Sequence, residues 1–513
     1  MIAPKNPSIA TRSERTNLMQ RRILSFILVL VMITLSFTAC AGSDDEDLIT
    51  PDDYNGSVAP EDDDDDDDDK DENKEYVPAE GKAEDVVHIT SASDLINKLT
   101  RKGTFHLDAD IDLTGLDYTP FGNYKYPFEG TFYGNGHTIT GLKITKSSGT
   151  TIGPAEYLLF NYEYAGLFGA TKNATITNLT VNNADISLKS DAEYSYVLCG
   201  IIAGYMTDTT VTDCTVNGKV HAESEKYQSM SGGISAITDG GKFNNVKVNA
   251  TITTDASYDH SASGGLTAYA FGGVELLNST VSGSVSAIST YGVAYAGGIA
   301  GYTRYVKAYV CCSEADIYAE TKYIAASEGT IGVAFAGGIF GTVDSEKNSE
   351  KSVVSRCYTV DGTTVNAVGN SSSAYAGGIV AKTFTATISA SYSKSNVSVS
   401  SKGMPVYIGS AFAHITETEG ITGCFGYGNL TAEQPQDKAY MGGFSGYPYD
   451  TVIQNCVYNS GAVFTLNGES TEVITTAMKF AAGQFVWEYL VNPLSLNPEQ
   501  WNTQTLTPLP YVG

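Results

Sequence analysis

The sequence predicts an all-β fold, a solenoid of about nine or more stacked coils with a short helical cap at each end. A small-residue position leads into an apolar residue nine times, at 166, 201, 233, 265, 298, 338, 378, 410 and 443. Repeats of 32 to 40 residues are typical of stacked units that cannot bury their apolar faces alone. The residue after each position is always apolar, as an inward-facing column requires: Leu167, Ile202, Ile234, Leu266, Ile299, Ile339, Ile379, Ala411 and Phe444.

A second column of small or weakly polar residues follows most of these positions by twelve to fourteen residues. Such residues at one repeating position are typical of a tight corner or a narrow interior. The column consists of Asn178, Cys214, Asn245, Asn278, Cys312, Cys357, Ser391, Cys424 and Cys456.

Residues 1–39 are predicted to be a lipoprotein signal peptide, with Met19 as a possible true start. Arg21 and Arg22 precede a short apolar run, which is too short for a comfortable membrane span. Cys40 follows Thr-Ala and resembles the lipidated cysteine of a bacterial lipobox. We therefore expect lipidation at Cys40 and localisation to the outer membrane, facing the cell exterior. An ordinary secretory signal with an incidental cysteine is the alternative.

Residues 40–85 are predicted to form an acidic, disordered stalk. The stretch from Asp44 to Asp85 holds 21 acidic and 3 basic residues, including the unbroken run Asp62 to Asp69. Like charges at this density repel one another and offer no apolar surface to bury. The net charge of −27 also argues against nucleic acid as a partner, because that function needs basic patches.

The folded part is predicted to run from residue 86 to 465. Ser93 is a candidate N-cap for a short helix over 94–99, and residues 104–107 and 110–113 alternate as strands do. Asn135-Gly136 is typical of a tight turn. At the other end, residues 466–513 are predicted to cap the solenoid with an amphipathic helix over 476–491 and an extended tail.

Two motifs resemble a known family. Gly166-Leu167-Phe168-Gly169, followed by residues 176–181, is similar to the GLUG motif of bacterial surface proteins, and residues 128–144 resemble the coil that often precedes it. The acidic residues after Cys40 resemble the export signal of Bacteroidota-type lipoproteins. The resemblance implies a right-handed parallel β-helix in an adhesin-like surface lipoprotein, and it transfers fold far better than function.

Cysteines and histidines give no sign of a metal or catalytic site. The sequence lacks a Cys-x-x-Cys spacing and a His-Glu-x-x-His motif, so we predict no metal, no cofactor and no catalytic residue. Cys312 with Cys357, and Cys424 with Cys456, are expected on adjacent coils, where they could form disulfides or stack as free thiols.

Tyrosines form the candidate binding site. Three residues before the repeating position stand Tyr295, Phe335, Tyr375, Tyr407 and Tyr440, which strand parity places in the core. Four residues after it the occupants vary, which indicates an outward face. Tyrosine suits sugar recognition because it combines a flat apolar ring with a polar edge. The candidate ligand-binding residues on this outward face are Tyr205, Tyr269, Tyr302 and Tyr447.

The leading functional hypothesis is a non-catalytic, adhesin-like binding protein that recognises a glycan, a host protein or a neighbouring surface protein. One alternative is a polysaccharide lyase or glycoside hydrolase, which requires paired carboxylates; Asp208, Asp213 and Asp239 are the only candidates found. Another alternative is a structural spacer or assembly partner without a ligand of its own. Extra residues at Tyr318–Ile331 and Asp344–Lys351 are expected to project as surface loops.

Overall fold

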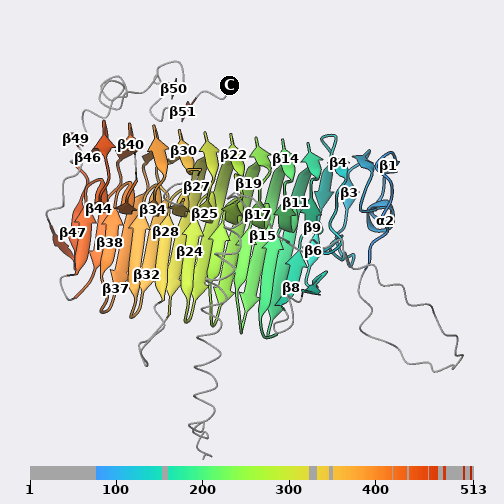
Figure 1. Ribbon diagram of the computed structural model, residues 1–513, viewed down its shortest axis with the longest axis horizontal. Coiled ribbons are helices and arrows are strands. Elements are labelled where there is room, and N and C mark those ends of the chain that lie inside the picture. Colours follow the sequence, from blue (N-terminus) through green and yellow to red (C-terminus); the bar gives the residue numbers. More distant parts are fainter. Residues whose placement is uncertain are drawn as a thin grey trace, which may run out of the picture. The chain divides into compact units, whose positions relative to one another are not determined.

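A computed structural model describes residues 77–152, 160–322, 332–345, 350–418, 420–435, 438–459, 461–471, 478–480, 501–502 and 509–510. The chain forms a parallel β-solenoid of about nine coils, as predicted, and each coil contributes strands to four stacked sheets (Figure 1). The predicted signal peptide, Cys40, most of the predicted stalk and most of the predicted C-terminal helix lie outside the described residues. Within that predicted helix, residues 478–480 form a strand instead, which pairs in parallel with residues 457–459. No described helix is long and apolar enough to cross a membrane.

We number the sheets 1 to 4 in the order in which the chain visits them within a coil. Sheet 1 begins with an antiparallel pair and is otherwise parallel. Its strands are β7 (Thr150–Ile152), β8 (Phe160–Ala165), β12 (Ser195–Gly200), β16 (Ser229–Gly232), β20 (Ser261–Gly264), β24 (Val293–Gly297), β28 (Val333–Gly337), β33 (Ser373–Gly377), β38 (Val406–Gly409) and β43 (Ala439–Gly442).

Sheet 2 follows directly after a short turn in every coil. Its strands are β9 (Phe168–Lys172), β13 (Ala203–Thr207), β17 (Ser235–Asp239), β21 (Thr267–Phe271), β25 (Ala300–Arg304), β29 (Phe340–Asp344), β34 (Val380–Phe384), β39 (Phe412–Thr416) and β44 (Ser445–Tyr449).

Sheet 3 consists of very short strands and extends furthest toward the N-terminus. Its strands are β1 (Val86–Ile89), β2 (Thr104–Leu107), β4 (Thr131–Tyr133), β10 (Thr175–Thr177), β14 (Thr210–Thr212), β18 (Lys242–Asn244), β22 (Glu275–Leu277), β26 (Lys307–Tyr309), β30 (Val353–Ser355), β35 (Thr387–Ser389), β40 (Gly420–Thr422) and β45 (Ile453–Gln454).

Sheet 4 closes each coil, with long strands in the middle of the solenoid and divided strands toward its end. Its strands are β3 (Ile111–Asp112), β5 (Thr138–Thr140), β6 (Lys143–Ile144), β11 (Thr180–Ser190), β15 (Thr215–Ser224), β19 (Lys247–Ala256), β23 (Thr280–Ser289), β27 (Cys312–Thr321), β31 (Tyr358–Thr359), β32 (Thr364–Gly369), β36 (Tyr392–Ser393), β37 (Asn396–Ser401), β41 (Phe425–Gly426), β42 (Leu430–Glu433), β46 (Val457–Asn459), β47 (Phe464–Leu466), β48 (Glu469–Ser470) and β49 (Met478–Phe480). A separate antiparallel pair joins β50 (Trp501–Asn502) and β51 (Leu509–Pro510).

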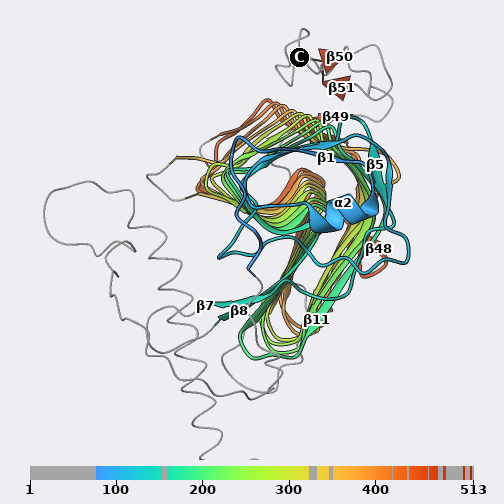
Figure 2. The same cartoon turned by 90° about the vertical axis from the view of Figure 1, so that its right-hand side faces the viewer.

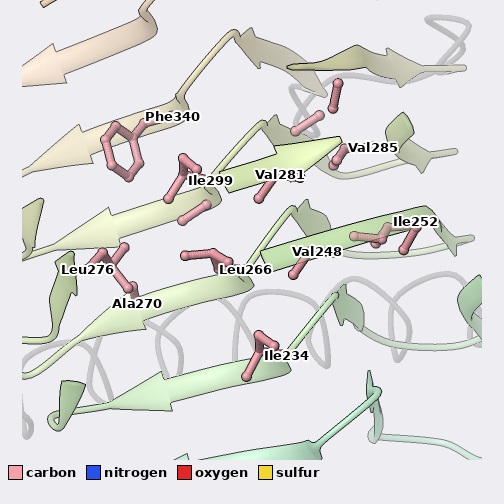
Figure 3. Packing of buried hydrophobic residues seen from close by; sticks show 14 of the residues in the cluster. Ile234, Val248, Ile252, Leu266, Ala270, Leu276, Val281, Val285, Ile299 and Phe340 are labelled. Carbon is pink, nitrogen blue, oxygen red and sulfur yellow. The ribbon is translucent and has the colours of Figure 1, made fainter. Parts of the chain in front are cut away.

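The predicted inward column is confirmed. All nine residues from Leu167 to Phe444 are fully buried and belong to one continuous core. Figure 3 shows part of this core, where Ile234, Leu266 and Ile299 stack from coil to coil and Val248 and Val281 stack opposite them from sheet 4. The strand pairing keeps the register that the repeat predicts, because Gly264 pairs with Gly297 and similar pairs recur along sheet 1.

The predicted second column mixed two neighbouring positions and, at Cys312, a third one that follows them. One is a corner between sheets 3 and 4 whose residues all have a left-handed backbone: Asn178, Asp213, Asn245, Asn278, Val310, Arg356, Ala390, Gly423 and Asn455. The next residue along the chain points into the core, and this position holds Cys214, Cys311, Cys357, Cys424 and Cys456. A similar left-handed corner separates sheets 2 and 3 in most coils, for example at Asn173 and Asp208.

At the N-terminal end, the expected helix begins earlier than predicted. Helix α2 spans Ala92–Asn97, and its N-cap is Ser91 rather than Ser93, because the Ser91 hydroxyl accepts a hydrogen bond from the backbone N–H of Asp94. The turn at Asn135-Gly136 is confirmed, since both residues have positive φ. The handedness of the solenoid and the helical caps stay predictions.

The left-handed corner gives a test of the fold. Arg356 occupies it with φ 56° and makes no ion pair among the described residues. Asparagine tolerates this conformation better than other non-glycine residues. Arg356→Asn should therefore be more stable toward urea unfolding than Arg356→Ala, by about 0.5–1 kcal/mol. Equal stability of the two variants would show that the corner imposes no backbone cost.

Candidate functional site

The outer faces of sheets 1 and 2 meet at a sharp corner. Figure 2, which looks along the solenoid, shows the coils folding inward where sheet 1 passes into sheet 2. Gly301 at this corner has little room for a side chain, because a Cβ there would lie 2.8 Å from the Ser263 carbonyl oxygen and 3.0 Å from that of Tyr295. Ala236 and Ala268 occupy the corresponding place in earlier coils. Side chains that point outward from the two sheets therefore point toward one another.

We call the residues at this corner the aromatic seam. It consists of two columns that run along the solenoid, one from each sheet. The sheet 1 column is Tyr164, Leu198, Met230, Ala262, Tyr295, Phe335, Tyr375, Tyr407 and Tyr440. The sheet 2 column is Ala170, Tyr205, Ile237, Tyr269, Tyr302, Thr342, Lys382, His414 and Tyr447.

The sheet 1 column was predicted to lie in the core, and this is wrong. Seam residues at the N-terminal end form a hydrophobic cluster of their own, separate from the main core, and Tyr295 packs against it. Tyr440 is 37% exposed. The flanking residues Ala294 and Ala296 point into the core instead. The error has a physical cause: the turn that follows the strand interrupts the alternation of side chains, so parity counted from Ile299 does not hold across it.

Five rings of the sheet 1 column stack face to face, beginning with Tyr295 and Phe335, whose centroids are 5.4 Å apart at an interplanar angle of 8°. The ring centroids of Phe335 and Tyr375 are 4.9 Å apart, those of Tyr375 and Tyr407 4.4 Å, and those of Tyr407 and Tyr440 4.7 Å, with interplanar angles of 2° to 25°. Each inner ring therefore uses both faces for packing and presents only its edge to solvent. Tyr440 is the last ring of this column.

The four predicted binding tyrosines all lie in the sheet 2 column of the seam. Tyr205, Tyr269 and Tyr302 are half-buried, and burial raises the pKa of all three hydroxyls. Tyr269 and Tyr302 contact each other with centroids 5.3 Å apart. Tyr447 is 37% exposed. The structure thus brings these residues onto one face, and it distinguishes three packed rings from one accessible ring.

The C-terminal end of the seam is an exposed tyrosine cluster that sequence reasoning found only in part. Tyr447 lies edge-on to Tyr440, with centroids 5.4 Å apart and an angle of 81°. It is parallel to Tyr449 within 6°, with centroids 6.5 Å apart, and Tyr449 is 55% exposed. Tyr449 stands two residues after Tyr447 on β44, so strand parity could have identified it.

Charged side chains interrupt the seam near its middle. Asp344 lies beside Tyr302 and near Lys382 and Arg304. Burial raises the pKa of Asp344 to about 6, although the two cations act in the opposite direction. The Lys382 ammonium lies 5.9 Å from the centre of the Phe335 ring. Burial and the Lys382 charge lower the pKa of His414 to about 4, so this seam histidine is neutral at physiological pH.

The carboxylates considered for catalysis are spread over two corners. Asp208 and Asp213 occupy the two left-handed corners on either side of β14. Asp239 lies one coil further, beside Asp208, and burial together with the Asp208 charge raises its pKa. The side chain of Asp213 accepts a hydrogen bond from Asn245 at 2.6 Å. No group of three or more potential metal ligands occurs among the described residues.

One of the two predicted cysteine pairs differs by one position from the prediction. Cys311, not Cys312, stacks on Cys357, because the register pairs Cys312 with Tyr358. The backbone N–H of Cys424 donates to the Sγ of Cys456 at 3.4 Å, so this pair is adjacent as predicted. All seven described cysteines are buried free thiols. Burial raises the pKa of Cys214 to about 12, which keeps it protonated and unreactive.

The charged centre of the seam generates a pH prediction. The pKa of Asp344 is raised from 3.8 to about 6, so ionisation of its carboxyl destabilises the folded state as pH rises through this range. Asp344→Asn removes this loss. The variant should gain about 1–2 kcal/mol of unfolding free energy relative to the wild type between pH 4 and pH 7.5. Denaturant titrations at four pH values would measure it; a difference that does not change with pH would contradict the assignment.

No protein-family model and no curated protein matches the chain. Among solved structures, it is similar to the crystal structure of a "putative immunoglobulin A1 protease" from Bacteroides ovatus. The identity is 16%, the alignment covers 82% of this chain and 91% of the other, and the TM-score is 0.32. A likeness at this level assigns no function to the present chain.

Proposed function

We propose that this protein is a cell-surface, lipid-anchored, adhesin-like binding protein that recognises a glycan through the open end of its aromatic seam, without catalysis. The observation that carries the proposal is the exposed cluster of Tyr440, Tyr447 and Tyr449 at the end of a column of packed rings. Exposed aromatic side chains that gather on one face are typical of a binding surface.

Tyrosine chemistry favours a glycan. A sugar ring has apolar C–H faces and a rim of hydroxyls, and a tyrosine offers a flat apolar ring with a hydroxyl at its edge. Stacking on a sugar requires a free ring face. The inner rings of the sheet 1 column have none, whereas Tyr447 lies edge-on to Tyr440, and Tyr440 ends the column. The binding site is therefore concentrated at β43 and β44.

The solenoid suits an extended ligand. Successive seam side chains repeat at the spacing of stacked strands, about 4.8 Å. A linear polymer that lies along the axis would meet the Tyr447 cluster first and then the edges and hydroxyls of the inner tyrosines. Tyr205, Tyr269 and Tyr302 would contribute through their edges, since they are half-buried.

The negative charge of the chain favours a neutral glycan over an anionic one. The protein carries a net charge of −27, and Asp344 lies beside Tyr302 near the middle of the seam. A polyanionic glycan would be repelled, so we expect a neutral polysaccharide. The proposed lipid anchor at Cys40 and the acidic stalk would place the seam away from the outer membrane, where such a polymer is accessible. The GLUG resemblance is consistent with this location.

Binding to an array of neutral polysaccharides tests the proposal. Tyr447→Ala should weaken the binding of any saturable hit by roughly five- to tenfold, because a stacking ring is lost, while Tyr447→Phe should retain most of it. The thermal unfolding temperature should change little, since the ring is exposed.

Tyr258→Ala is a matched control. Tyr258 is 54% exposed and stacks on Tyr291, but it lies on the loop between β19 and β20, outside the seam. An equal loss of affinity in this variant would show that binding is not specific to the seam. Shortening of the bound polysaccharide would favour the enzymatic alternative instead, and the absence of any hit would favour a structural role.

A further inference from the structure

The last four coils differ from the preceding ones in sheet 4. From β15 to β27 the strands run unbroken for ten residues. In the later coils each strand divides in two at a bend, giving the pairs β31 and β32, β36 and β37, β41 and β42, and β46 and β47. A cavity of 280 Å³ opens at these bends. We call it the bend cavity. Its polar and aromatic lining consists of Asp361, Lys394, Asn396, Tyr427, Asn429 and Asn459.

The bend cavity contains a cation and an anion in contact. The side chain of Lys394 is only 4% exposed, and its ammonium lies 3.2 Å from the Oδ2 of Asp361. Asp361 is 65% exposed. Because the two charges cancel, the cavity attracts neither an anion nor a cation strongly. It offers both hydrogen-bond donors and an acceptor.

Two asparagines are held in place by the backbone of the next coil. The Oδ1 of Asn396 accepts a hydrogen bond from the backbone N–H of Asn429 at 3.2 Å. In the same way, the Oδ1 of Asn429 accepts from the backbone N–H of Val463 at 2.8 Å. This leaves the Nδ2 groups of Asn396 and Asn429 without a hydrogen-bond partner among the described residues. Both donors are oriented by the fold before any ligand binds.

Hydroxyl groups beneath the bends make the site rigid. The Thr363 and Ser395 hydroxyls lie 2.6 Å apart, Ser395 donates to Thr359 at 2.8 Å, and Thr359 lies 3.0 Å from the Ser393 hydroxyl. All four residues are buried. A network of this kind fixes the backbone on which Lys394 and Asn396 stand, so the cavity is largely preformed.

We propose that the bend cavity binds one neutral sugar ring. Its volume lies near the lower end of the roughly 300–1,000 Å³ of small-molecule sites, which fits a single ring rather than a chain. Asp361 can accept hydrogen bonds from hydroxyl groups, while the Nδ2 groups of Asn396 and Asn429 can donate to them. Tyr427 supplies the aromatic surface on which the ring packs.

Other ligand classes fit less well. A charged ligand would gain little, because the contact between Asp361 and Lys394 leaves the cavity without a net charge that attracts an anion or a cation. An apolar ligand would cover the exposed amides of Asn396 and Asn429 without giving them a hydrogen-bond partner, which costs about 1–3 kcal/mol for each group that it buries. The site lies on sheet 4, whereas the aromatic seam lies on sheets 1 and 2, so this proposal does not depend on the function proposed for the seam.

The test uses the full chain and four separate probes, which are D-glucose, D-galactose, D-mannose and N-acetyl-D-glucosamine. Saturation-transfer NMR and calorimetric titration would measure binding, with D-glucuronate and glycerol as comparison ligands. We expect saturable binding of at least one neutral sugar and no comparable binding of the two comparison ligands. Absence of binding for all four probes, or equal binding of glycerol, would overturn the proposal.

Conservative substitutions test whether the sugar binds in the bend cavity. Asn396→Asp and Asn429→Asp keep the Oδ1 that accepts the backbone hydrogen bond but remove the Nδ2 donor, so the fold should be retained. Each should weaken sugar binding about fivefold, the effect of one lost hydrogen bond. Asn366→Asp, on β32 outside the cavity, adds the same charge and should have no effect.

The variants also separate this proposal from the seam. Tyr447→Ala should leave binding of the single sugars unchanged. If it abolished this binding, or if both cavity variants bound as tightly as the wild type, the sugar would be bound elsewhere and the bend cavity would be excluded.

Discussion

The fold depends on each coil returning to the same register above the one before it. Parallel strands provide evenly spaced hydrogen bonds, but they do not by themselves decide where the chain turns. The left-handed corners do, because a residue such as Asn178 or Asn278 turns the chain from sheet 3 into sheet 4 at the same place in each coil. The apolar column from Leu167 to Phe444 then stacks without interruption. The outer surface has the same regularity, so residues at one repeating position of successive coils form a column along the molecule.

The aromatic seam and the bend cavity are two results of this regularity. The seam arises where two sheets meet at an inward corner, so outward side chains from both sheets pack together and only the end of the column is open. The cavity arises where a strand that is continuous in earlier coils divides in two. The first site offers ring faces and the second offers fixed hydrogen-bond donors. They would recognise different features of a carbohydrate, a length of polymer in one case and a single ring in the other.

Much of the architecture could be predicted from the sequence, because the spacing of small residues reports the coil length directly. The inward column was predicted correctly since Ile234, Leu266 and Ile299 follow immediately after that position. Predictions further from it were less accurate. Strand alternation did not predict the outward direction of Tyr295, because a turn lies between it and Ile299. The cysteine column was assigned to Cys312, although the residue in that column is the preceding one, Cys311. The bend cavity was missed because a divided strand leaves the repeat length nearly unchanged. A weak signal existed in the glycines that follow Asp361 and Tyr427.

The interior cysteines provide a way to follow how the solenoid unfolds. Cys214, Cys311, Cys357, Cys424 and Cys456 occupy one position in different coils, and all are buried. A thiol reacts with an alkylating reagent only after it reaches solvent. Because each of these thiols marks a known coil, the order in which they are alkylated would report whether the stack unravels from its first coils, from its last coils, or from both ends at once.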